Sequence, residues 1–372
     1  MSDKIIKVLN IIGKRPTGGI GSVVYNYQSN FTNENLKSDY MIFANENDGE
    51  FDQKVRKLGS KVYVMPELKY TNLFTLIKKI DAFFAEKASQ YNAIHLHSVN
   101  IGFLCYPIAK KYGIENLIAH SHATMYSDKK LNAIRNYFLC IPLKKWANRY
   151  FACSNAAGEF LYGKKAVEDG NVLVLNNAID CNKFKFNVQV RTSVRKELNI
   201  EGKFVVGNVG RFNKQKNHSF LIKIFSEIKK INGNSILLLI GEGPLKEGIK
   251  EKVKKLGLEN DVIFLGQRSD VEQLLQAMDV FLLPSLYEGL PVIGVEAQAT
   301  GLPCFMTDTI TKEVNINNVQ YFSLNENVIE LAKKIIDFCE TYERCNQNEK
   351  VAKAGFDISI EAKKLQEIYL NM

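Results

Sequence analysis

Two glutamates, Glu288 and Glu296, stand eight positions apart in the segment PSLYEGLPVIGVEAQATGLP. An apolar run precedes them at residues 280–283 and predicts a buried parallel strand, so we expect Glu288 in the loop at its carboxyl end and Glu296 on the next helix. Ligands of open α/β sheets bind at that edge. Two carboxylates there can accept hydrogen bonds from sugar hydroxyls, although the same spacing also fits an ordinary helix start with one exposed acid.

A basic cluster follows a second predicted buried strand, residues 204–209, in the run FVVGNVGRFNKQKN. Its arginine, Arg211, offers a planar fork for two phosphate oxygens, and Lys216 adds a mobile point charge. Together they suit a diphosphate and can stabilise the charge that develops as it departs. A solvated basic turn would show the same residues, but this cluster lies at the same predicted strand edge as Glu288, which favours phosphate binding.

Two glycine-rich segments follow predicted strands. PTGGIGSVV, at residues 16–24, opens a helix, where the backbone amides of Gly18 and Gly19 can approach a phosphate or a sugar closely. LIGEGPLKEG, at residues 239–248, resembles a dinucleotide-binding fingerprint, but Pro244 lacks a backbone donor and the next strand ends without an acid for the ribose. We therefore disfavour NAD binding.

Four of the five histidines end two predicted strands at one sheet edge: His95 and His97 in AIHLH, and His120 and His122 in LIAHSH. Four imidazoles can hold zinc. However, the chain has no H-E-x-x-H, and side chains at i and i+2 of a strand point the same way, so we expect each pair to line a cleft rather than enclose an ion. The chain also lacks the D-x-D that often holds a divalent ion on a diphosphate. We expect no metal and no other cofactor.

The length of the chain, 372 residues, exceeds the roughly 100 to 200 typical of one domain and predicts two domains. Hydrophobic residues at 46% and charged residues at 24% are typical of a soluble globular protein, and no apolar run approaches the roughly 20 residues that span a bilayer. The first residues lead into an apolar strand without a signal-peptide cleavage site, and seven scattered cysteines have no C-x-x-C spacing. These features predict a cytoplasmic protein with reduced thiols.

The net charge of +9 lies wholly in the N-terminal half: residues 1–190 contain 25 Lys and Arg against 16 Asp and Glu, whereas residues 191–372 contain 24 of each. Residues 131–150 can form one interfacial helix for an anionic membrane leaflet, or a core-facing helix with a solvated basic side. Nucleic acid is disfavoured because no helix-turn-helix or zinc finger accompanies the charge. The basic and aromatic side chains of that helix would be Arg135, Lys144, Lys145, Trp146 and Arg149.

Apolar runs that alternate with helical patterns predict an α/β fold of parallel sheets covered by helices on both faces. A polar, poorly periodic stretch around residues 181–192 indicates a linker, which gives domains at 1–185 and 186–355, with a final helix within 356–372 packed back on the first domain. The candidate strands are residues 7–12, 40–44, 61–64, 93–96, 116–120, 150–152 and 172–175 in the first half, and 204–209, 236–240, 262–265, 280–283, 303–306 and 320–322 in the second.

Taken in order, the motifs resemble the GT4 family of retaining glycosyltransferases, and most of all its bacterial capsular and exopolysaccharide enzymes. The motifs are the TGGIG loop, the AHSH strand end, the G-R-F-x-x-Q-K-N run at residues 210–217, the GEGP turn, the FLGQRSDV segment and the E-x7-E of Glu288 and Glu296. The resemblance covers nearly the whole chain. It implies a GT-B fold, in which two Rossmann-like domains have parallel sheets that face a central cleft and the second domain holds most of a nucleotide sugar.

The resemblance also implies a role for individual residues. Glu296 would bind the ribose hydroxyls, Glu288 the donor sugar, and Arg211 and Lys216 the diphosphate. The other implied positions are His120 at the donor sugar, with His122 as its alternative, Gly18 and Gly19 near the phosphate and acceptor, Gly289 and Leu290 in the loop of Glu288, and Gly241, Gly243 and Arg268 around the base.

A protein of this kind would move a sugar, with retention at the anomeric carbon, from a nucleotide sugar of the UDP type to a saccharide or an undecaprenyl-diphosphate-linked saccharide, during cell-surface polysaccharide biosynthesis. It would work in the cytoplasm, on the inner face of the cell membrane if it binds that surface. Two alternatives remain: another GT-B enzyme, such as a nucleotide-sugar epimerase or a phosphorylase, and a non-catalytic protein that binds polysaccharide or nucleic acid. The second alternative would have no use for acids and cations gathered at one strand edge.

Overall fold

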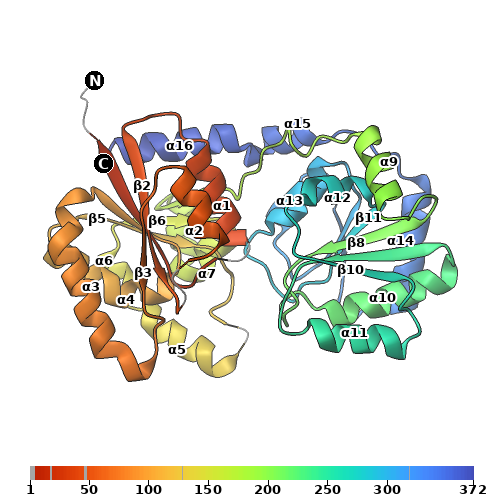
Figure 1. Cartoon of the computed structure of the whole chain (residues 1–372), viewed down its shortest axis with the longest axis horizontal. Helices are drawn as coiled ribbons and strands as arrows, with labels where there is room; N and C mark the ends of the chain where they lie inside the picture. The colour runs from red at the N-terminus through yellow and green to blue at the C-terminus, as the bar shows by residue number, and fades with distance from the viewer. Residues whose placement is uncertain (1–4, 17–18, 46–47, 128, 318) are drawn as a thin grey trace. The chain divides into compact units, whose positions relative to one another are not determined.

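The computed structural model describes residues 5–16, 19–45, 48–127, 129–317 and 319–372. The chain splits into two compact units, Met1–Ala178 with Ile358–Met372, and Ile179–Asp357 (Figure 1). The last helix, α16 (Ile358–Leu370), therefore belongs to the first unit, where it packs against α1, β1 and β2.

The first unit is built on a seven-stranded parallel sheet in the order β3-β2-β1-β4-β5-β6-β7. Helices flank both faces of this sheet (Figure 1). The strands are β1 (Ile6–Ile12), β2 (Leu36–Phe43), β3 (Val62–Met65), β4 (Ala93–Leu96), β5 (Asn116–Ser121), β6 (Arg149–Ala152) and β7 (Val172–Val174). Its other helices are α1 (Gly19–Ser29), α2 (Glu50–Lys57), α3 (Leu73–Lys87), α4 (Gly102–Lys111), α5 (Lys130–Cys140), α6 (Leu143–Trp146), α7 (Asn155–Tyr162) and α8 (Lys164–Glu168).

The second unit has a six-stranded parallel sheet in the order β10-β9-β8-β11-β12-β13. Its strands are β8 (Phe204–Val209), β9 (Ser235–Ile240), β10 (Val262–Gly266), β11 (Val280–Leu283), β12 (Cys304–Thr307) and β13 (Val319–Phe322). Its helices are α9 (Val188–Glu197), α10 (His218–Ile231), α11 (Lys246–Lys255), α12 (Val271–Ala277), α13 (Val292–Ala299), α14 (Val328–Thr341) and α15 (Asn348–Val351). The two sheets are those of an α/β, Rossmann-like fold, as the alternating pattern predicted.

Both sheets are buried on both faces, which explains why their central strands are continuous apolar runs. In β9, residues 237–239 are three leucines with no exposed surface, and Phe281 of β11 is equally enclosed. Burying one such side chain contributes about 1.5–3 kcal/mol, so the apolar strand residues hold each sheet together. The polar residues at the carboxyl ends of these strands are therefore presented from a rigid base.

The strand order of each sheet reverses at one point, between β1 and β4 in the first unit and between β8 and β11 in the second. At such a point the loops that follow the two central strands leave in opposite directions and open a crevice at the carboxyl edge. In the second unit these are the loops that carry Arg211 and Glu288. In the first unit the flanking strand β4 carries His95, and β5 beside it carries His120.

The structure corrects two expectations about helices. Residues 131–150 do not form one helix, because α5 ends at Cys140, α6 begins after Pro142, and Arg149 starts strand β6. Pro142 has no backbone N–H to continue the hydrogen bonding of α5. In the predicted linker, α9 begins at Val188 because the side chain of Asn187 caps it, accepting a hydrogen bond from the Val190 amide at 3.0 Å.

Candidate active site

Lys216 and Glu288 form an ion pair at the carboxyl edge of the second sheet. The Lys216 ammonium lies 2.7 Å from Glu288 Oε1, and both side chains are largely buried. Lys216 comes from the loop between β8 and α10, and Glu288 from the loop between β11 and α13. The Leu286 amide donates to the carbonyl of Gln215 at 2.8 Å and ties the two loops together. The strand order thus brings together two residues that lie 72 positions apart.

The carboxylate of Glu288 accepts hydrogen bonds from three side chains. Lys216 Nζ and Ser285 Oγ, at 2.7 and 2.8 Å, donate to Oε1, and Gln215 Nε2, at 3.1 Å, donates to Oε2. Only 8% of the Glu288 residue surface is exposed. A buried charge is tolerated when it is paired and hydrogen-bonded, and this one is. The pair therefore fixes the position of the Lys216 ammonium.

Arg211 differs from Lys216 in its surroundings. Its side chain is exposed and forms no ion pair or side-chain hydrogen bond with any residue that the structure describes. A guanidinium in this state retains all of its donors for a ligand. The loop after β8 thus presents one fixed ammonium and one unpaired guanidinium, a combination suited to two linked phosphates.

The glycine turn after β9 packs directly against the loop of Arg211. Gly241 and Gly243 have φ angles of +136° and +158°, and a Cβ atom on them would lie 2.2 Å from the Gly210 carbonyl oxygen and 2.5 Å from the Phe212 carbonyl oxygen. Any side chain there would displace backbone, so both positions require glycine. The Phe212 amide donates to the Glu242 carbonyl at 3.0 Å, which anchors the turn beside the cationic loop.

Glu296 lies on α13, half-buried, and no residue that the structure describes donates a hydrogen bond to its carboxylate. Burial raises the pKa of this carboxyl to about 7; Lys183 opposes the shift, and Glu272 adds to it. A carboxylate without an internal donor has its lone pairs available for hydroxyl groups. Glu296 thus differs from Glu288, whose carboxylate oxygens already accept hydrogen bonds from neighbouring side chains.

The remaining predicted residues of the second unit lie in two settings. Arg268, which follows β10, is held by Asp270 through two hydrogen bonds of 2.8 and 2.6 Å. Gly289 and Leu290 are buried in the loop between β11 and α13. In the first unit, Gly19 begins α1 and is exposed, and Gly18 lies outside the described residues.

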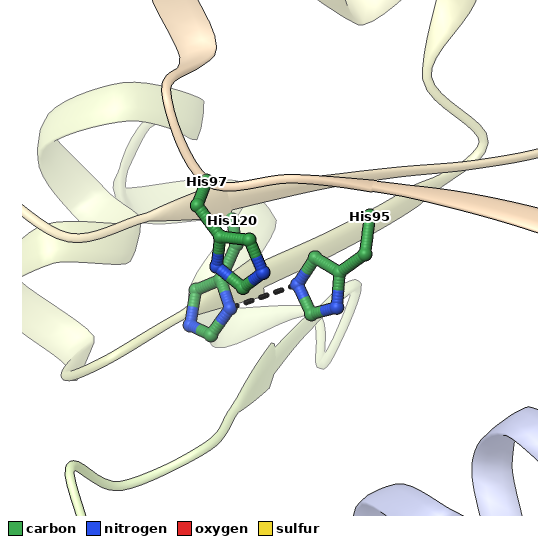
Figure 2. Close-up of side chains that lie close together, drawn as sticks. All are labelled: His95, His97 and His120. Atoms are coloured by element: carbon green, nitrogen blue, oxygen red, sulfur yellow. Dashed lines mark hydrogen bonds between the residues drawn. The ribbon is translucent and has the colours of Figure 1, made fainter. Parts of the chain in front are cut away.

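The four histidines of the first unit form a block of imidazoles. His95 stacks on His97 with ring centroids 4.2 Å apart, and His120 stacks on His122 at 4.0 Å. Hydrogen bonds connect the stacks: His95 Nε2 lies 3.0 Å from His120 Nδ1, and His97 Nδ1 lies 3.0 Å from His122 Nε2. Figure 2 shows His95, His97 and His120 gathered in this way. His95, His97 and His120 are buried, whereas His122 is half-buried.

The block holds neutral rings. Burial lowers the pKa of His95, His97 and His120 well below the ordinary value, and lowers that of His122 to about 4. Nitrogen atoms of the first three lie within 4.8 Å of one another, so the block is a candidate metal site. However, ring nitrogens of the block are already hydrogen-bonded to one another, His95 to His120 and His97 to His122, and a zinc ion with ligands at about 2.0–2.1 Å would have to replace these bonds.

The sequence analysis missed several residues that belong to these networks. Gln215 and Ser285 donate to Glu288, and Asn10 of β1 accepts from His97, with Oδ1 and Nε2 3.1 Å apart. Gln215 stands inside the G-R-F-x-x-Q-K-N motif, where it received no role. Asn10 interrupts the apolar strand KVLNII, and a polar residue in a buried strand is the signal that could have identified it.

Two family models match the chain. The model described as Glycosyl transferases group 1 matches residues 190–355, and the one described as Glycosyltransferase Family 4 matches residues 17–183. A putative glycosyltransferase of Bacillus subtilis, EpsF, is 30% identical over 371 residues, which are 98% of this chain and 96% of that protein. The UDP-Gal:alpha-D-GlcNAc-diphosphoundecaprenol alpha-1,3-galactosyltransferase of Escherichia coli is 25% identical over 303 residues, 77% of each chain.

Solved structures share the fold. Anabaena Alr3699/HepE in complex with UDP and glucose has a TM-score of 0.78 at 20% identity, covering 99% of this chain and all of that one. The sucrose-phosphate synthase of Thermosynechococcus elongatus has a TM-score of 0.79 at 18% identity, covering 98% of both chains. These likenesses extend over both units.

Proposed function

Because the chain belongs to the GT4-type glycosyltransferases of the GT-B fold, we propose that it transfers a sugar from a UDP-sugar to a saccharide or a lipid-linked saccharide, with retention at the anomeric carbon. The observation that carries this proposal is the group of Arg211, Lys216 and Glu288 at the β8 and β11 strand ends. The Escherichia coli relative, whose name gives a diphosphoundecaprenol-linked sugar as its acceptor, supports the acceptor class.

In the proposed complex, the diphosphate lies against the loop after β8. Arg211 binds two phosphate oxygens through its planar fork, and Lys216 binds a third from the position that Glu288 gives it. The ribose hydroxyls donate to Glu296, whose oxygens have no donor among the described residues. The base lies near the turn of Gly241 and Gly243, which packs against the backbone of the loop that carries Arg211.

The proposed transfer takes place on one face of the sugar. The acceptor oxygen forms its bond to the anomeric carbon on the side from which the diphosphate leaves, and the acceptor proton passes to an oxygen of the departing phosphate. Because bond formation and departure use the same face, configuration is retained without a side-chain nucleophile. Arg211 and Lys216 stabilise the negative charge that grows on the leaving diphosphate, which lowers the barrier.

A membrane surface is the further partner that we propose for a lipid-linked acceptor. Helix α5 exposes Leu131, Ile134 and Phe138, with 82%, 56% and 61% of their surfaces accessible. Their spacing of three and four residues places them on one side of the helix. Between residues 129 and 149 there are six Lys and Arg and no Asp or Glu. An exposed apolar stripe in a segment whose charged residues, from 129 to 149, are all basic suits an anionic lipid surface. No helix among the described residues is long and apolar enough to cross a bilayer.

The function is tested by incubating the protein with UDP-glucose, UDP-galactose, UDP-N-acetylglucosamine or UDP-N-acetylgalactosamine and a polyprenyl-diphosphate saccharide. We expect one donor to raise the melting temperature, since a ligand at 100 times its Kd stabilises by about 2.7 kcal/mol. We also expect acceptor-dependent UDP release and an α-linked product by proton NMR. An epimerised nucleotide sugar or a sugar phosphate would identify another GT-B reaction, and no thermal shift with any donor would contradict the proposal.

A further inference from the structure

Two hydrogen-bonded chains run through the histidine block and end differently. In one, the Tyr369 hydroxyl bonds His95, and His95 bonds His120, whose Nε2 is fully buried and has no partner among the described residues. In the other, Asn10 bonds His97, and His97 bonds His122. Figure 2 shows how closely the rings of the two chains approach each other at His97 and His120.

The amide of Asn10 sets the direction of the second chain. Its Nδ2 donates to the backbone carbonyl of Asp39 at 3.5 Å, and a carbonyl can only accept. The amide oxygen therefore faces His97, where Oδ1 lies 3.1 Å from Nε2. Since Oδ1 is an acceptor, the proton of this hydrogen bond belongs to His97 Nε2.

The proton positions of the next two rings follow from this. Burial lowers the pKa of His97, so the ring is neutral, and with a proton on Nε2 its Nδ1 carries a lone pair. That lone pair accepts from His122 Nε2 at 3.0 Å, which places the His122 proton on Nε2. Burial lowers the pKa of His122 to about 4, so this ring is also neutral and its Nδ1 is an acceptor.

His122 Nδ1 is the open end of the chain. It has no hydrogen bond within the described residues, and unlike His120 Nε2 it is not fully buried. Neutral Nδ1 can accept from a hydroxyl, which carries a proton, but not from a phosphate oxygen that carries none. His122 Nδ1, the last atom of this series of hydrogen bonds, can therefore bind a saccharide hydroxyl but not an oxygen of the diphosphate.

We propose that Asn10 and His97 are positioning residues that fix the Nε2–H tautomer of His122, so that His122 Nδ1 accepts a hydrogen bond from a saccharide hydroxyl. This inference rests on the proposed function, and it assigns the sugar contact to His122 of the two histidines that the sequence left open. His120 stays enclosed between His95 and its stack on His122. The hydroxyl belongs either to the donor sugar or to the acceptor saccharide, and the kinetic test below separates the two.

The tautomer is tested first, on the full chain without substrate. With ¹⁵N-labelled histidine, long-range ¹H–¹⁵N spectra at pH 7 show which ring nitrogen carries the proton. We expect one tautomer, Nε2–H, for His122 in the wild type and a mixture in His97→Gln, whose amide reaches the Nε2 position but offers no acceptor at Nδ1. His95→Gln is the matched control, because His95 is equally buried and stacked but belongs to the other chain.

Steady-state kinetics then test whether the Nε2–H tautomer of His122 contributes to sugar transfer. The assay measures UDP release from the nucleotide sugar that gives the largest thermal shift. We expect kcat/KM to fall about fivefold in His97→Gln and about tenfold in His122→Gln, and to recover in part in His122→Asn, whose amide reaches the Nδ1 position. His95→Gln should stay within about twofold of wild type. If the hydroxyl is on the donor, acceptor-independent hydrolysis of the donor falls as well, and if it is on the acceptor, only the acceptor KM rises.

Three outcomes would overturn the inference: a proton on His122 Nδ1 in the wild type, equal losses in His95→Gln and His97→Gln, or full activity of His122→Gln. Each of these can occur in a protein that transfers sugar normally, so the inference can fail while the proposed function stands. The reverse also holds, because the substrate-free spectra report the tautomer even if no nucleotide sugar is turned over.

Discussion

The ammonium of Lys216 lies 2.7 Å from the carboxylate of Glu288. A bound diphosphate must therefore share or take over a cation that already has a partner. In the proposed complex, Glu288 would act on the phosphate through Lys216, in addition to the sugar contact that the family resemblance implies. The three internal donors on Glu288 leave little of its carboxylate for a substrate hydroxyl.

Glu288→Gln should lower kcat much more than the affinity for UDP. The amide keeps the size of the side chain but removes the charge that positions Lys216, and it leaves the ribose contact intact. It should also lower the melting temperature, since loss of one partner of a buried ion pair costs about 3–5 kcal/mol. Calorimetric titration with UDP, steady-state kinetics and thermal unfolding check these points.

The matched control is Glu247→Gln, which breaks the exposed pair of Glu247 and Lys250 on α11. Exposed pairs contribute about 0–1 kcal/mol, so this variant should resemble the wild type. If Glu288→Gln loses UDP affinity and kcat to the same extent, Glu288 also contributes to nucleotide binding. The assignment of the sugar to Glu288 and of the ribose to Glu296 is then wrong.

Arg211→Gln should lower the rate at saturating donor by a factor of about 100, because the charge that Arg211 stabilises grows as the bond to the anomeric carbon breaks. Arg211→Lys should recover only part of this, since an ammonium lacks the planar fork. Lys223→Gln, on an exposed position of α10, is the control. Should the KM for the donor rise while kcat stays unchanged, Arg211 contributes to binding alone.

Much of this site could be predicted from the sequence because its positions depend on local patterns. Apolar runs located the strands, and residues that follow parallel strands share one sheet edge, which placed Arg211 and Glu288 together. The contact between Lys216 and Glu288 could not be predicted, because it depends on β8 and β11 being neighbours, and strand order is a property of the whole sheet. The end of α5 was missed because the amphipathic pattern continues past Pro142 although the backbone hydrogen bonding does not.

The affinity for UDP should increase as the pH rises from 6 to 8 through ionisation of Glu296. Its pKa is raised to about 7 by burial, and only the ionised form accepts from both ribose hydroxyls. The stability of the fold should change with pH in the opposite direction. The folded state keeps this proton up to about pH 7, whereas the unfolded chain loses it near pH 4.5, so the free energy of unfolding should fall as the pH rises from about 4.5 to about 7.

Glu296→Gln is the variant that isolates these effects, because the phosphate of UDP also titrates in this range. It should remove the part of the pH dependence that belongs to the carboxyl, both in calorimetric UDP binding and in thermal unfolding. Glu296→Ala should weaken UDP binding by about 1.5–3 kcal/mol, the contribution of a hydrogen bond to a charged group. Unchanged affinity in both variants would remove Glu296 from the nucleotide site.

Turnover should continue in excess EDTA. Ring nitrogens of the histidine block are hydrogen-bonded to one another, and in the proposed complex Arg211 and Lys216 supply the charge that a divalent ion would otherwise provide. Activity with and without EDTA, together with metal analysis of the purified protein, decides this. A complete loss that added Zn²⁺, Mn²⁺ or Mg²⁺ reverses would make the histidine block, or the diphosphate itself, a metal site.

Vesicles of anionic lipid should bind the protein at low salt, and vesicles of neutral lipid should bind it far less. Each basic side chain near such a surface contributes about 1 kcal/mol, so replacing Lys130, Lys145 and Arg149 by Gln should lower the partition about fivefold for each change, and high salt should have a similar effect. Lys144 is left in place because its ammonium donates to the Tyr162 carbonyl at 3.0 Å.

The apolar stripe of α5 is tested separately, by Leu131→Asn with Phe138→Asn, because both side chains are exposed and their loss should not disturb the core. This double substitution should weaken vesicle binding at every salt concentration, whereas the substitutions of Lys and Arg by Gln should weaken it only at low salt. Replacing Lys196, Lys254 and Lys255, which are exposed on the second unit, changes the net charge equally and is the control. If that control loses as much binding as the α5 and α6 variants, the attraction comes from net charge, and a soluble saccharide becomes the better acceptor.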